Sequence, residues 1–345
     1  MRKFLLKLLP CALFSILITV VLPVVIDPYN VFHYKNIRDN GVEPNKNYVK
    51  MRYILDNPDR FNAYLFGSSR VGGIDVDRMK GLHCYNMTYS VGVPLEHLNN
   101  LETFLQNGIV PRMVLIGIDD LACFVNPELH KNDLLRTPPP ESNGIIETIT
   151  FLLKYFNPKV LISVPIILSH TRDEQNYREQ FYTNGGRLRN STVSLKKYNW
   201  DKAVPAWGYQ YDNRTEEAIT EIQKIIDLCN AHNIRLLIFT NPMHVLTYQK
   251  SVENGYLDFL HRLSDITEYY NFSSINDVTT NNNYYHETSH YKIPVGDMII
   301  DRIFDNGIDE PLQAQGFGYY VTKNNRDAFF ALLNTQINKG NSHAF

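Results

Sequence analysis

The stretch AYLFGSSR, residues 63–70, combines a short apolar run with an abrupt polar ending. Its first four residues are apolar and are followed by turn formers, a pattern that predicts a short buried strand ending near Phe66. In an open parallel α/β sheet, ligands bind in the crevice at the carboxyl ends of the strands. Ser69 therefore occupies a position where its hydroxyl can act as a nucleophile, provided that a base reaches it. The alternative is an ordinary polar turn between a strand and a helix, because Gly and Ser are common turn residues.

The composition is that of an ordinary folded globule. The chain has 345 residues, of which 44% are hydrophobic and 20% are charged, which is enough for one large domain or two small ones. The net charge of −2 gives no basic footprint, so nucleic acid is not expected as a partner. The four cysteines show no CxxC or Cys/His spacing of a zinc site, and we expect neither a metal nor another cofactor.

An uncharged apolar run occupies residues 8–26. Its length is close to the about 20 residues that a helix needs to cross a bilayer. Arg2, Lys3 and Lys7 precede the run and Asp27 follows it, so the positive-inside rule predicts a cytoplasmic N-terminus and an extracytoplasmic chain, periplasmic or at the cell surface. A cleaved signal peptide is the rival interpretation. The length of the run and the lack of a small-x-small cleavage site near its end favour an uncleaved signal anchor over residues 1–27.

Apolar runs and helical patterns alternate beyond the anchor, which predicts an α/β fold with a central parallel sheet. We expect strands at residues 63–66, 84–87, 113–118, 234–239, 272–278 and 319–321. We expect helices at residues 46–55, 94–106, 145–156, 160–169, 216–232, 256–263, 294–304 and 326–338.

The alternation stalls over residues 121–213, which contain three consecutive prolines and a long polar stretch rich in Arg, Asn and Tyr. A long structureless loop inside a compact domain is uncommon and is usually a lid, a binding loop or a disordered segment. We therefore expect an insertion over the cleft. The predicted organisation is an anchor at 1–27, an α/β domain at 28–310 carrying this insertion, and a C-terminal extension at 311–345.

Among the eleven histidines, His290 has the sequence context of a base for Ser69. A serine hydroxyl needs a base, histidine titrates nearest neutral pH, and a carboxylate normally fixes the tautomer of the imidazole. His290 lies in a polar, turn-rich segment, three residues after Glu287 and directly before a predicted helix. A compact turn over residues 287–290 can bring the carboxylate and the imidazole together. The alternative is a loop pair without a role, which is common for Glu-x-x-His.

Together these blocks resemble those of the SGNH/GDSL hydrolase superfamily. Gly67-Ser68-Ser69 is similar to the Gly-x-Ser block near the start of that α/β domain, and Glu287-x-x-His290 is similar to the Asp-x-x-His block near its end. With Asp-Pro-Tyr at 27–29 after the anchor, the chain resembles the membrane-anchored bacterial SGNH-like proteins. These include groups similar to alginate O-acetylation proteins and to the D-alanyl-teichoic-acid transfer protein. The resemblance runs from about residue 27 to 305, with the insertion unmatched.

The resemblance implies a flavodoxin-like three-layer SGNH fold and serine-dependent acyl-ester chemistry. It implies Ser69 as the nucleophile, His290 as the general base and Glu287 as the orienting acid, where the family usually has Asp. Gly92 matches the glycine whose N–H joins that of Ser69 in the oxyanion hole, and such donors usually contribute the largest catalytic term.

The third block departs from the family pattern, because Gly117-Ile118-Asp119 stands where the family has Gly-x-Asn. An ionised Asp119 would repel an oxyanion, so it is protonated, has another role, or does not correspond to the family Asn. Asn241 and Asn86 are then alternative donors. Arg70 has two interpretations, as a cation that binds an anionic or carbonyl group of the substrate, or as the partner in a salt bridge at the start of the next helix.

The resulting expectation is an SGNH-type serine O-acyltransferase or esterase that acts on cell-envelope polysaccharide. An acyl-enzyme on Ser69 would pass its group to water or to a sugar hydroxyl, and a membrane protein is the expected source of the acyl donor. The alternative is a non-catalytic protein that binds glycan through its tyrosine-rich insertion or assembles an envelope polysaccharide complex.

Overall fold

The computed structural model describes residues 2–140, 144–171, 174–186, 198–206, 214–305, 307 and 309–342. The chain divides into two compact units. We call Met1–Asn57 with Glu128–Tyr182 the helical unit, and Pro58–Pro127 with Thr183–Phe345 the sheet unit. The boundaries of these two units differ from those of the predicted anchor, α/β domain and extension. The domain boundaries expected near residues 27 and 310 therefore stay a prediction.

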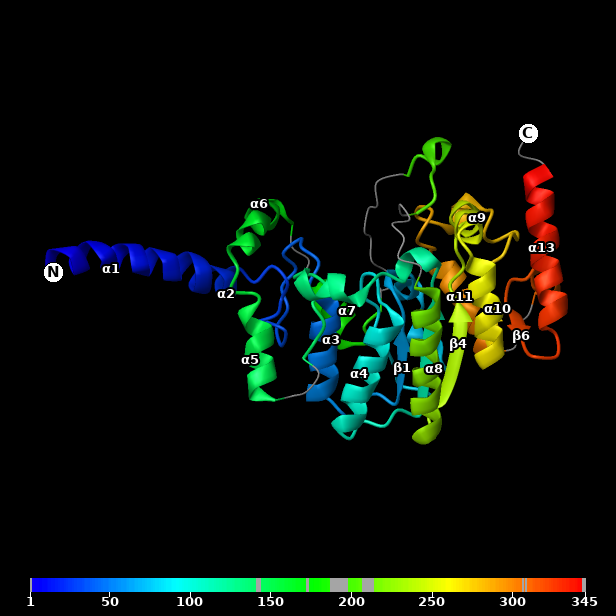
Figure 1. Ribbon diagram of the computed structural model, residues 1–345, viewed down its shortest axis with the longest axis horizontal. Coiled ribbons are helices and arrows are strands. Elements are labelled where there is room, and N and C mark those ends of the chain that lie inside the picture. The colour runs from blue at the N-terminus through cyan, green and yellow to red at the C-terminus, as the bar shows by residue number, and fades with distance from the viewer. Residues whose placement is uncertain are drawn as a thin grey trace. The chain divides into compact units, whose positions relative to one another are not determined.

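The sheet unit is an α/β fold built around one six-stranded sheet (Figure 1). In chain order its strands are β1 (Ala63–Phe66), β2 (Cys84–Asn86), β3 (Met113–Ile118), β4 (Arg235–Thr240), β5 (Tyr269–Asn271) and β6 (Tyr319–Val321). The spatial order is β2-β1-β3-β4-β5-β6, in which β1 to β5 pair in parallel and β6 is antiparallel to β5. The prediction of an α/β fold with a central parallel sheet is confirmed for five strands, and the sixth reverses direction.

Side chains of β1 contribute to the core on both faces of the sheet. Ala63 and Leu65 belong to the apolar cluster that also contains residues of α11 (Ile293–Phe304). Tyr64 and Phe66 pack against Phe104 of α4 (Pro94–Gln106), with centroid distances of 4.6 and 6.3 Å. All four strand residues are buried, as expected for a strand in a parallel sheet that is covered on both sides.

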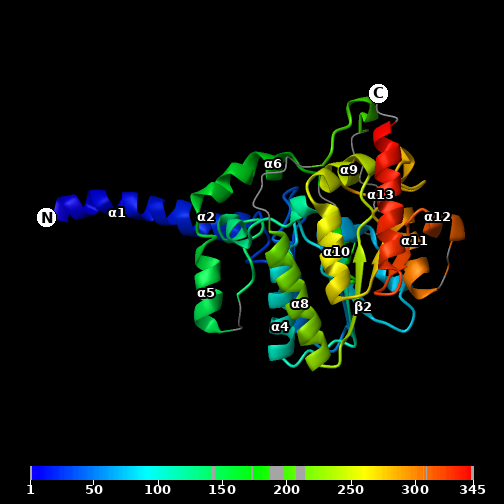
Figure 2. The same cartoon turned by 45° about the vertical axis from the view of Figure 1, so that its right-hand side comes forward.

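Besides α4 and α11, the helices of the sheet unit are α8 (Thr215–Ala231), α9 (Val245–Glu253), α10 (Tyr256–Ile266), α12 (Glu310–Ala314) and α13 (Arg326–Ser342). Five helices of the sheet unit, α4, α8, α10, α11 and α13, lie where the apolar patterns predicted them, whereas α9 and α12 were not predicted. α4 begins at Pro94, whose fixed φ and missing N–H suit the first turn of a helix, and it has the predicted bounds. α4 and α8 pack side by side, and both views show them parallel to the strands (Figures 1 and 2).

The strand expected at 272–278 is wrong, because the fifth strand is β5, Tyr269–Asn271. Short polar side chains after Phe272 bond to nearby backbone instead of leaving it free for a sheet. The Oδ1 atom of Asn276 accepts from the N–H groups of Val278 and Thr279 at 2.9 Å each. The segment therefore forms a turn.

The helical unit contains the apolar N-terminal helix as α1 (Arg2–Ile16), a π-helical turn (Leu17–Val21) and α2 (Leu22–Ile26). The stretch Leu8–Ile26, 19 residues, is long and apolar enough to cross a membrane. The other helices are α3 (Lys46–Asp56), α5 (Ile145–Leu153), α6 (Val164–Ser169) and α7 (Glu174–Tyr182), with a 3-10 turn, η6 (Pro158–Ser163), before α6. Their core contains Tyr48 stacked on Phe151 at 4.3 Å.

Three expectations for residues 121–213 need correction. The predicted helix 145–156 ends at Leu153, and the predicted helix 160–169 is η6 followed by α6, because Asn157 caps a 3-10 turn that begins with Pro158. The polar stretch also contains a helix, α7, that was expected to be loop. The parts at 187–197 and 207–213 lie outside the described residues.

We predict that Gly117→Ala lowers the free energy of unfolding by about 1–3 kcal/mol, the usual cost of overpacking a core. A Cβ atom there would meet Val71 and would lie 3.0 Å from Asn241 Nδ2 and from Phe239 Cζ. Urea unfolding of the full-length chain in detergent measures the change. Gly73→Ala is the matched control, because its Cβ would meet Tyr291 at an ordinary 3.5 Å. Equal losses for the two variants would contradict the prediction.

Candidate active site

Ser69 lies where the sequence predicted, directly after the carboxyl end of β1. It begins the 3-10 turn η2 (Ser69–Gly73), and Ser68 caps this turn by accepting from the N–H of Arg70 at 3.3 Å. Thr88 Oγ1 donates to the Ser68 carbonyl at 2.7 Å and ties the turn to the segment after β2. Ser68 is buried and Ser69 is half-buried, so the Ser69 hydroxyl is the more accessible of the two.

His290 lies on a loop that is fixed to the core at both ends. Tyr285 and Tyr291 pair across the loop in an antiparallel bridge, and both rings are buried. The Tyr285 hydroxyl donates to the Pro242 carbonyl at 3.2 Å, and the Tyr291 hydroxyl donates to Asn241 Oδ1 at 3.1 Å. The segment after β4 thereby holds the base of the loop, while His290 at its end is about a quarter exposed, at 26%.

The structure brings Ser69, His290 and Glu287 together. Ser69 Oγ lies 2.7 Å from His290 Nε2, although the two residues are 221 positions apart in the chain. The other ring nitrogen, Nδ1, is hydrogen-bonded to Glu287 Oε1. The Glu287 carboxylate also accepts from the backbone N–H of Ser289 at 2.7 Å and of His290 at 2.9 Å. The turn over residues 287–290 is thus compact, as the sequence predicted.

The Glu287 carboxylate determines which ring nitrogen of His290 donates a hydrogen bond. Burial raises the pKa of Glu287, but the hydrogen bond from His290, the charge of its ring and the two backbone N–H groups outweigh burial, so the pKa lies below its ordinary value. An ionised carboxylate only accepts hydrogen bonds, so Nδ1 of His290 must donate to it. In a neutral imidazole, Nε2 then has a free lone pair that accepts the proton of Ser69. This is the arrangement that removes a proton from a serine hydroxyl.

Arg70 points into the protein and is 1% exposed. Its Nη1 donates to Asp119 Oδ1 at 3.0 Å and to Asp120 Oδ1 at 2.7 Å, and both carboxylates are buried. Burial alone would lower the pKa of Arg70, but Asp120 and Asp119 raise it well above its ordinary value. Of the two interpretations of Arg70, the ion pair is the one that this geometry forms, and little of the side chain is left for a ligand.

The same guanidinium also reaches the loop that carries His290. Its Nε donates to the Ser289 carbonyl at 3.0 Å, and its Nη2 donates to Ser289 Oγ at 3.2 Å. Arg70 therefore joins the end of β3 to the residue directly before His290. The sequence reasoning missed Asp120 and Ser289 as partners. The Asp-Asp pair after one strand and the single Arg after a neighbouring strand were the signal for this contact.

Asp119 and the two alternative amides are engaged within the protein. Asp119 Oδ1 accepts from Arg70 and also from Asn241 Nδ2, at 3.0 Å each. Asn86 Nδ2 donates to the Val71 carbonyl at 2.8 Å. The role of Asp119 in an oxyanion hole stays a prediction, and so does that of each amide.

Gly92 lies against the turn that carries the serine. A Cβ atom at this position would lie 2.9 Å from the Gly67 carbonyl oxygen and 2.8 Å from His97 Cε1. Only glycine fits so close to the backbone. Gly92 is therefore next to the Gly67–Ser69 segment, and its role in an oxyanion hole stays a prediction.

No family model matches the chain, and no curated protein matches it. The resemblance to the SGNH superfamily accordingly stays a prediction. In the part of the chain that the structure describes, no three or more His, Cys, Asp or Glu side chains are grouped so that they could hold a metal ion.

We predict that Arg70→Met lowers the free energy of unfolding by about 3–5 kcal/mol, because it leaves two buried carboxylates without their cation. Arg78→Met is the matched control. Arg78 also pairs with two carboxylates, Asp297 and Asp301, but it is 32% exposed, and such surface pairs contribute about 0–1 kcal/mol. Urea unfolding in detergent measures both variants, and a loss for Arg70→Met no larger than that for Arg78→Met would refute the prediction.

We also predict that the stability difference between the wild type and Glu287→Gln shrinks as the pH falls below about 4.5. The folded-state pKa of Glu287 is depressed, so its stabilising contribution is present above the ordinary value and is lost as the pH falls through the folded value. Unfolding free energies between pH 7 and pH 3 test this. For Glu253→Gln, on an exposed pair with Lys250, the difference should stay small throughout; a Glu287 difference independent of pH would count against the assignment.

Proposed function

We propose that the chain is an SGNH-type serine O-acyltransferase or esterase that acts on cell-envelope polysaccharide. The observation that carries the proposal is the continuous hydrogen-bonded relay from Ser69 Oγ through the His290 ring to the Glu287 carboxylate. This order of hydroxyl, imidazole and carboxylate is the arrangement that activates a serine nucleophile on unrelated folds.

The chemistry follows from the positions of these groups. Nε2 of His290 takes the proton of Ser69 as the hydroxyl attacks the acyl carbonyl, and the resulting imidazolium is stabilised by Glu287. The same proton then goes to the leaving group, which gives an acyl-enzyme on Ser69. Water or a sugar hydroxyl takes the acyl group in the second half of the reaction, and His290 again serves as base.

The sheet supports the assignment to the SGNH fold. Its strand order over the five parallel strands, 2-1-3-4-5, is the flavodoxin-like order of doubly wound α/β sheets, whose ligands bind at the carboxyl ends of the strands. Ser69 follows β1 and the Asp119–Asp120 pair follows β3, so both lie at that edge of the sheet. Helices cover both faces, as a three-layer SGNH domain requires.

The N–H groups of Ser69 and Gly92 are the proposed oxyanion donors, since Gly92 packs against the Gly67 carbonyl. Arg70 offsets the charge of Asp119, so that an ionised carboxylate can stand near the site in place of the family Asn. In this proposal, Arg70 positions the His290 loop through Ser289 and does not bind substrate.

The apolar stretch Leu8–Ile26 supports a single-pass anchor with the catalytic domain outside the cytoplasm. A hydroxyl-rich acceptor in that compartment is envelope polysaccharide, which favours transfer over plain hydrolysis. A membrane protein is the proposed source of the acyl donor.

We predict that Ser69→Ala abolishes covalent labelling by a fluorophosphonate probe, because the probe reacts only with an activated serine hydroxyl. In-gel detection of the labelled full-length chain in detergent measures this. Ser68→Ala is the matched control: it removes the neighbouring hydroxyl and a cap contributing about 1 kcal/mol, and it should keep the labelling. Equal labelling of Ser69→Ala and wild type would rule out Ser69 as the nucleophile.

A non-catalytic glycan-binding or assembly protein is the second candidate. It is favoured by the carboxylate at Asp119 and by the use of Asn241 Nδ2 to bond that carboxylate, since the third oxyanion donor of the family is then missing. In that case the wild type would not react with the fluorophosphonate probe. Polysaccharide would still bind the wild type and Ser69→Ala with equal affinity.

A further inference from the structure

The second half of the helical unit exposes a group of large apolar side chains. They lie on α5, on η6 and on α6, and they include Ile145 and Ile162 at 79% and 76% exposure and Leu168 at 81%. Several large, strongly exposed apolar side chains on neighbouring elements are unusual in a soluble monomer when they form one patch, and such patches usually mark contact with a protein or a membrane. We call this group the apolar face: Ile145, Ile146, Ile149, Leu153, Ile162 and Leu168.

α5 is apolar on two sides. Ile145, Ile149 and Leu153 follow one another at intervals of four residues, which places them on one side of the helix, and all three are exposed. Phe151 on the other side is buried and stacks on Tyr48 at 4.3 Å. The exposed side of a helix in a globular protein is normally polar or charged, and Glu147 and Thr150 are the exposed polar residues of α5 beside these three. The inner side of α5 packs against the core of the helical unit. The apolar side chains on its outer side would be stabilised by contact with an apolar environment.

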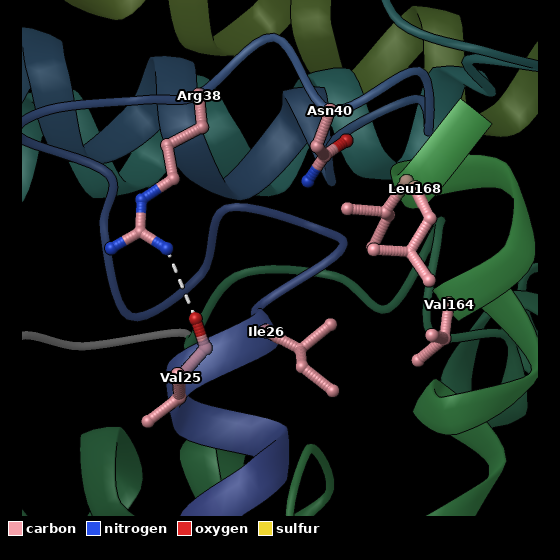
Figure 3. Close-up of a pocket in the computed structure, with 7 residues that line it drawn as sticks. Val25, Ile26, Arg38, Asn40, Val164 and Leu168 are labelled. Atoms are coloured by element: carbon pink, nitrogen blue, oxygen red, sulfur yellow. Dashed lines mark hydrogen bonds between the residues drawn. The ribbon is translucent and has the colours of Figure 1, made fainter. Parts of the chain in front are cut away.

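The elements that carry the apolar face lie beside the end of the apolar N-terminal helix. α2, the end of that helix, packs against η6, and α5 and α6 lie next to α2 in both views (Figures 1 and 2). A pocket of about 180 Å³ is lined by Val25 and Ile26 from α2 and by Val164, Ile167 and Leu168 from α6 (Figure 3).

Arg38 marks the polar border of this pocket. Its Nη1 donates to the Val25 carbonyl at 3.0 Å, so it satisfies one of the last carbonyls of the N-terminal helix (Figure 3). Arg38 and Asn40 are the polar residues of a lining that is otherwise aliphatic. A cation at the end of an apolar helix suits the headgroup level of a bilayer.

We propose that α5, η6 and α6 form a second membrane contact, in which the apolar face lies in the interfacial layer of the bilayer beside the point where the N-terminal helix leaves it. This contact rests on the proposed membrane anchor and is separate from the proposed chemistry at Ser69. The proposed occupant of the face is lipid, because the face lies beside a helix that is long and apolar enough to cross a membrane.

The charges favour a shallow position over a second span. Ile145–Leu153 and Pro158–Ser169 are apolar enough together to cross a membrane, but they are bent by 57°. α5 alone has 9 residues, far fewer than the about 20 that a span needs. Lys154 and Lys159 flank the bend and are exposed, and a deeply inserted bend would take both cations into hydrocarbon. In the interface their ammonium groups reach the headgroups.

Depth-dependent fluorescence quenching of the full-length chain tests the proposal. The chain is reconstituted in phosphatidylcholine vesicles that contain about 30% phosphatidylglycerol, which supplies anionic headgroups. In a Cys11→Ser background, Ile146→Cys, Ile162→Cys and Leu168→Cys each carry an environment-sensitive dye. Cys84, Cys123 and Cys229 are buried and should not react.

Two further labels serve as controls. Val110→Cys, in the same Cys11→Ser background, is an exposed aliphatic position on the sheet unit, at 58% exposure. Native Cys11, labelled in the otherwise unchanged chain, reports on the N-terminal helix. We expect lipids with a shallow nitroxide to quench the dyes at 146, 162 and 168 several-fold more than the dye at 110. Aqueous iodide should quench the same three dyes several-fold less.

Each other outcome overturns a defined part of the proposal. If iodide reaches the three dyes as well as it reaches position 110 while lipid quenches Cys11, the second contact is wrong and the anchor stands. If lipid does not quench Cys11, the anchor and the contact that rests on it are both wrong. Protection from lipid and from iodide alike would mean that protein covers the face. Stronger quenching by deep than by shallow nitroxides would replace the interfacial position by a span.

Discussion

The buried cation of Arg70 holds together the parts of the candidate site. Its guanidinium joins the carboxylates that follow β3 to Ser289 on the His290 loop, and its own backbone N–H bonds to the Ser68 cap. A buried charge is costly unless its partners are well placed, and removing one partner leaves the other uncompensated. The ion pair therefore demands that β1, β3 and the loop before α11 keep one arrangement. That arrangement puts Ser69 within hydrogen-bond distance of His290.

The polar groups of the candidate site differ in their exposure to solvent. Ser69, His290 and Glu287 are partly exposed, whereas Arg70 and Asp120 are almost fully buried. In the proposed chemistry, the reactive groups need access to a substrate, and the groups that fix their positions are better removed from water, where their hydrogen bonds compete less with solvent. The position of each residue in the chain gives no hint of this division, since Ser69 and Arg70 are neighbours.

The helical unit follows a different constraint, which is the placement of apolar surface. Tyr48, Phe151 and Tyr155 form its aromatic core, and the outer side of α5 and the N-terminal helix leave aliphatic side chains exposed. Single exposed aliphatic side chains are common, but several of them on neighbouring elements usually mark contact with a protein or a membrane. The proposed membrane contact gives both exposed surfaces the same environment.

The sequence by itself determined the apolar runs of β1 and β3, the bounds of α4, and the compact turn of residues 287–290, because local patterns and capping residues specify such elements. It did not specify that the fifth strand ends at Asn271 and that a turn follows, where side chains such as Asn276 bond to the backbone, or α7 in a stretch of mostly polar residues. Only the tertiary structure decided that Arg70 pairs with Asp119 and Asp120 rather than facing a ligand, and that Ser69 meets His290 across 221 positions. Contacts between residues far apart in the chain depend on how strands and loops pack. A local sequence pattern does not specify the distance between their side chains.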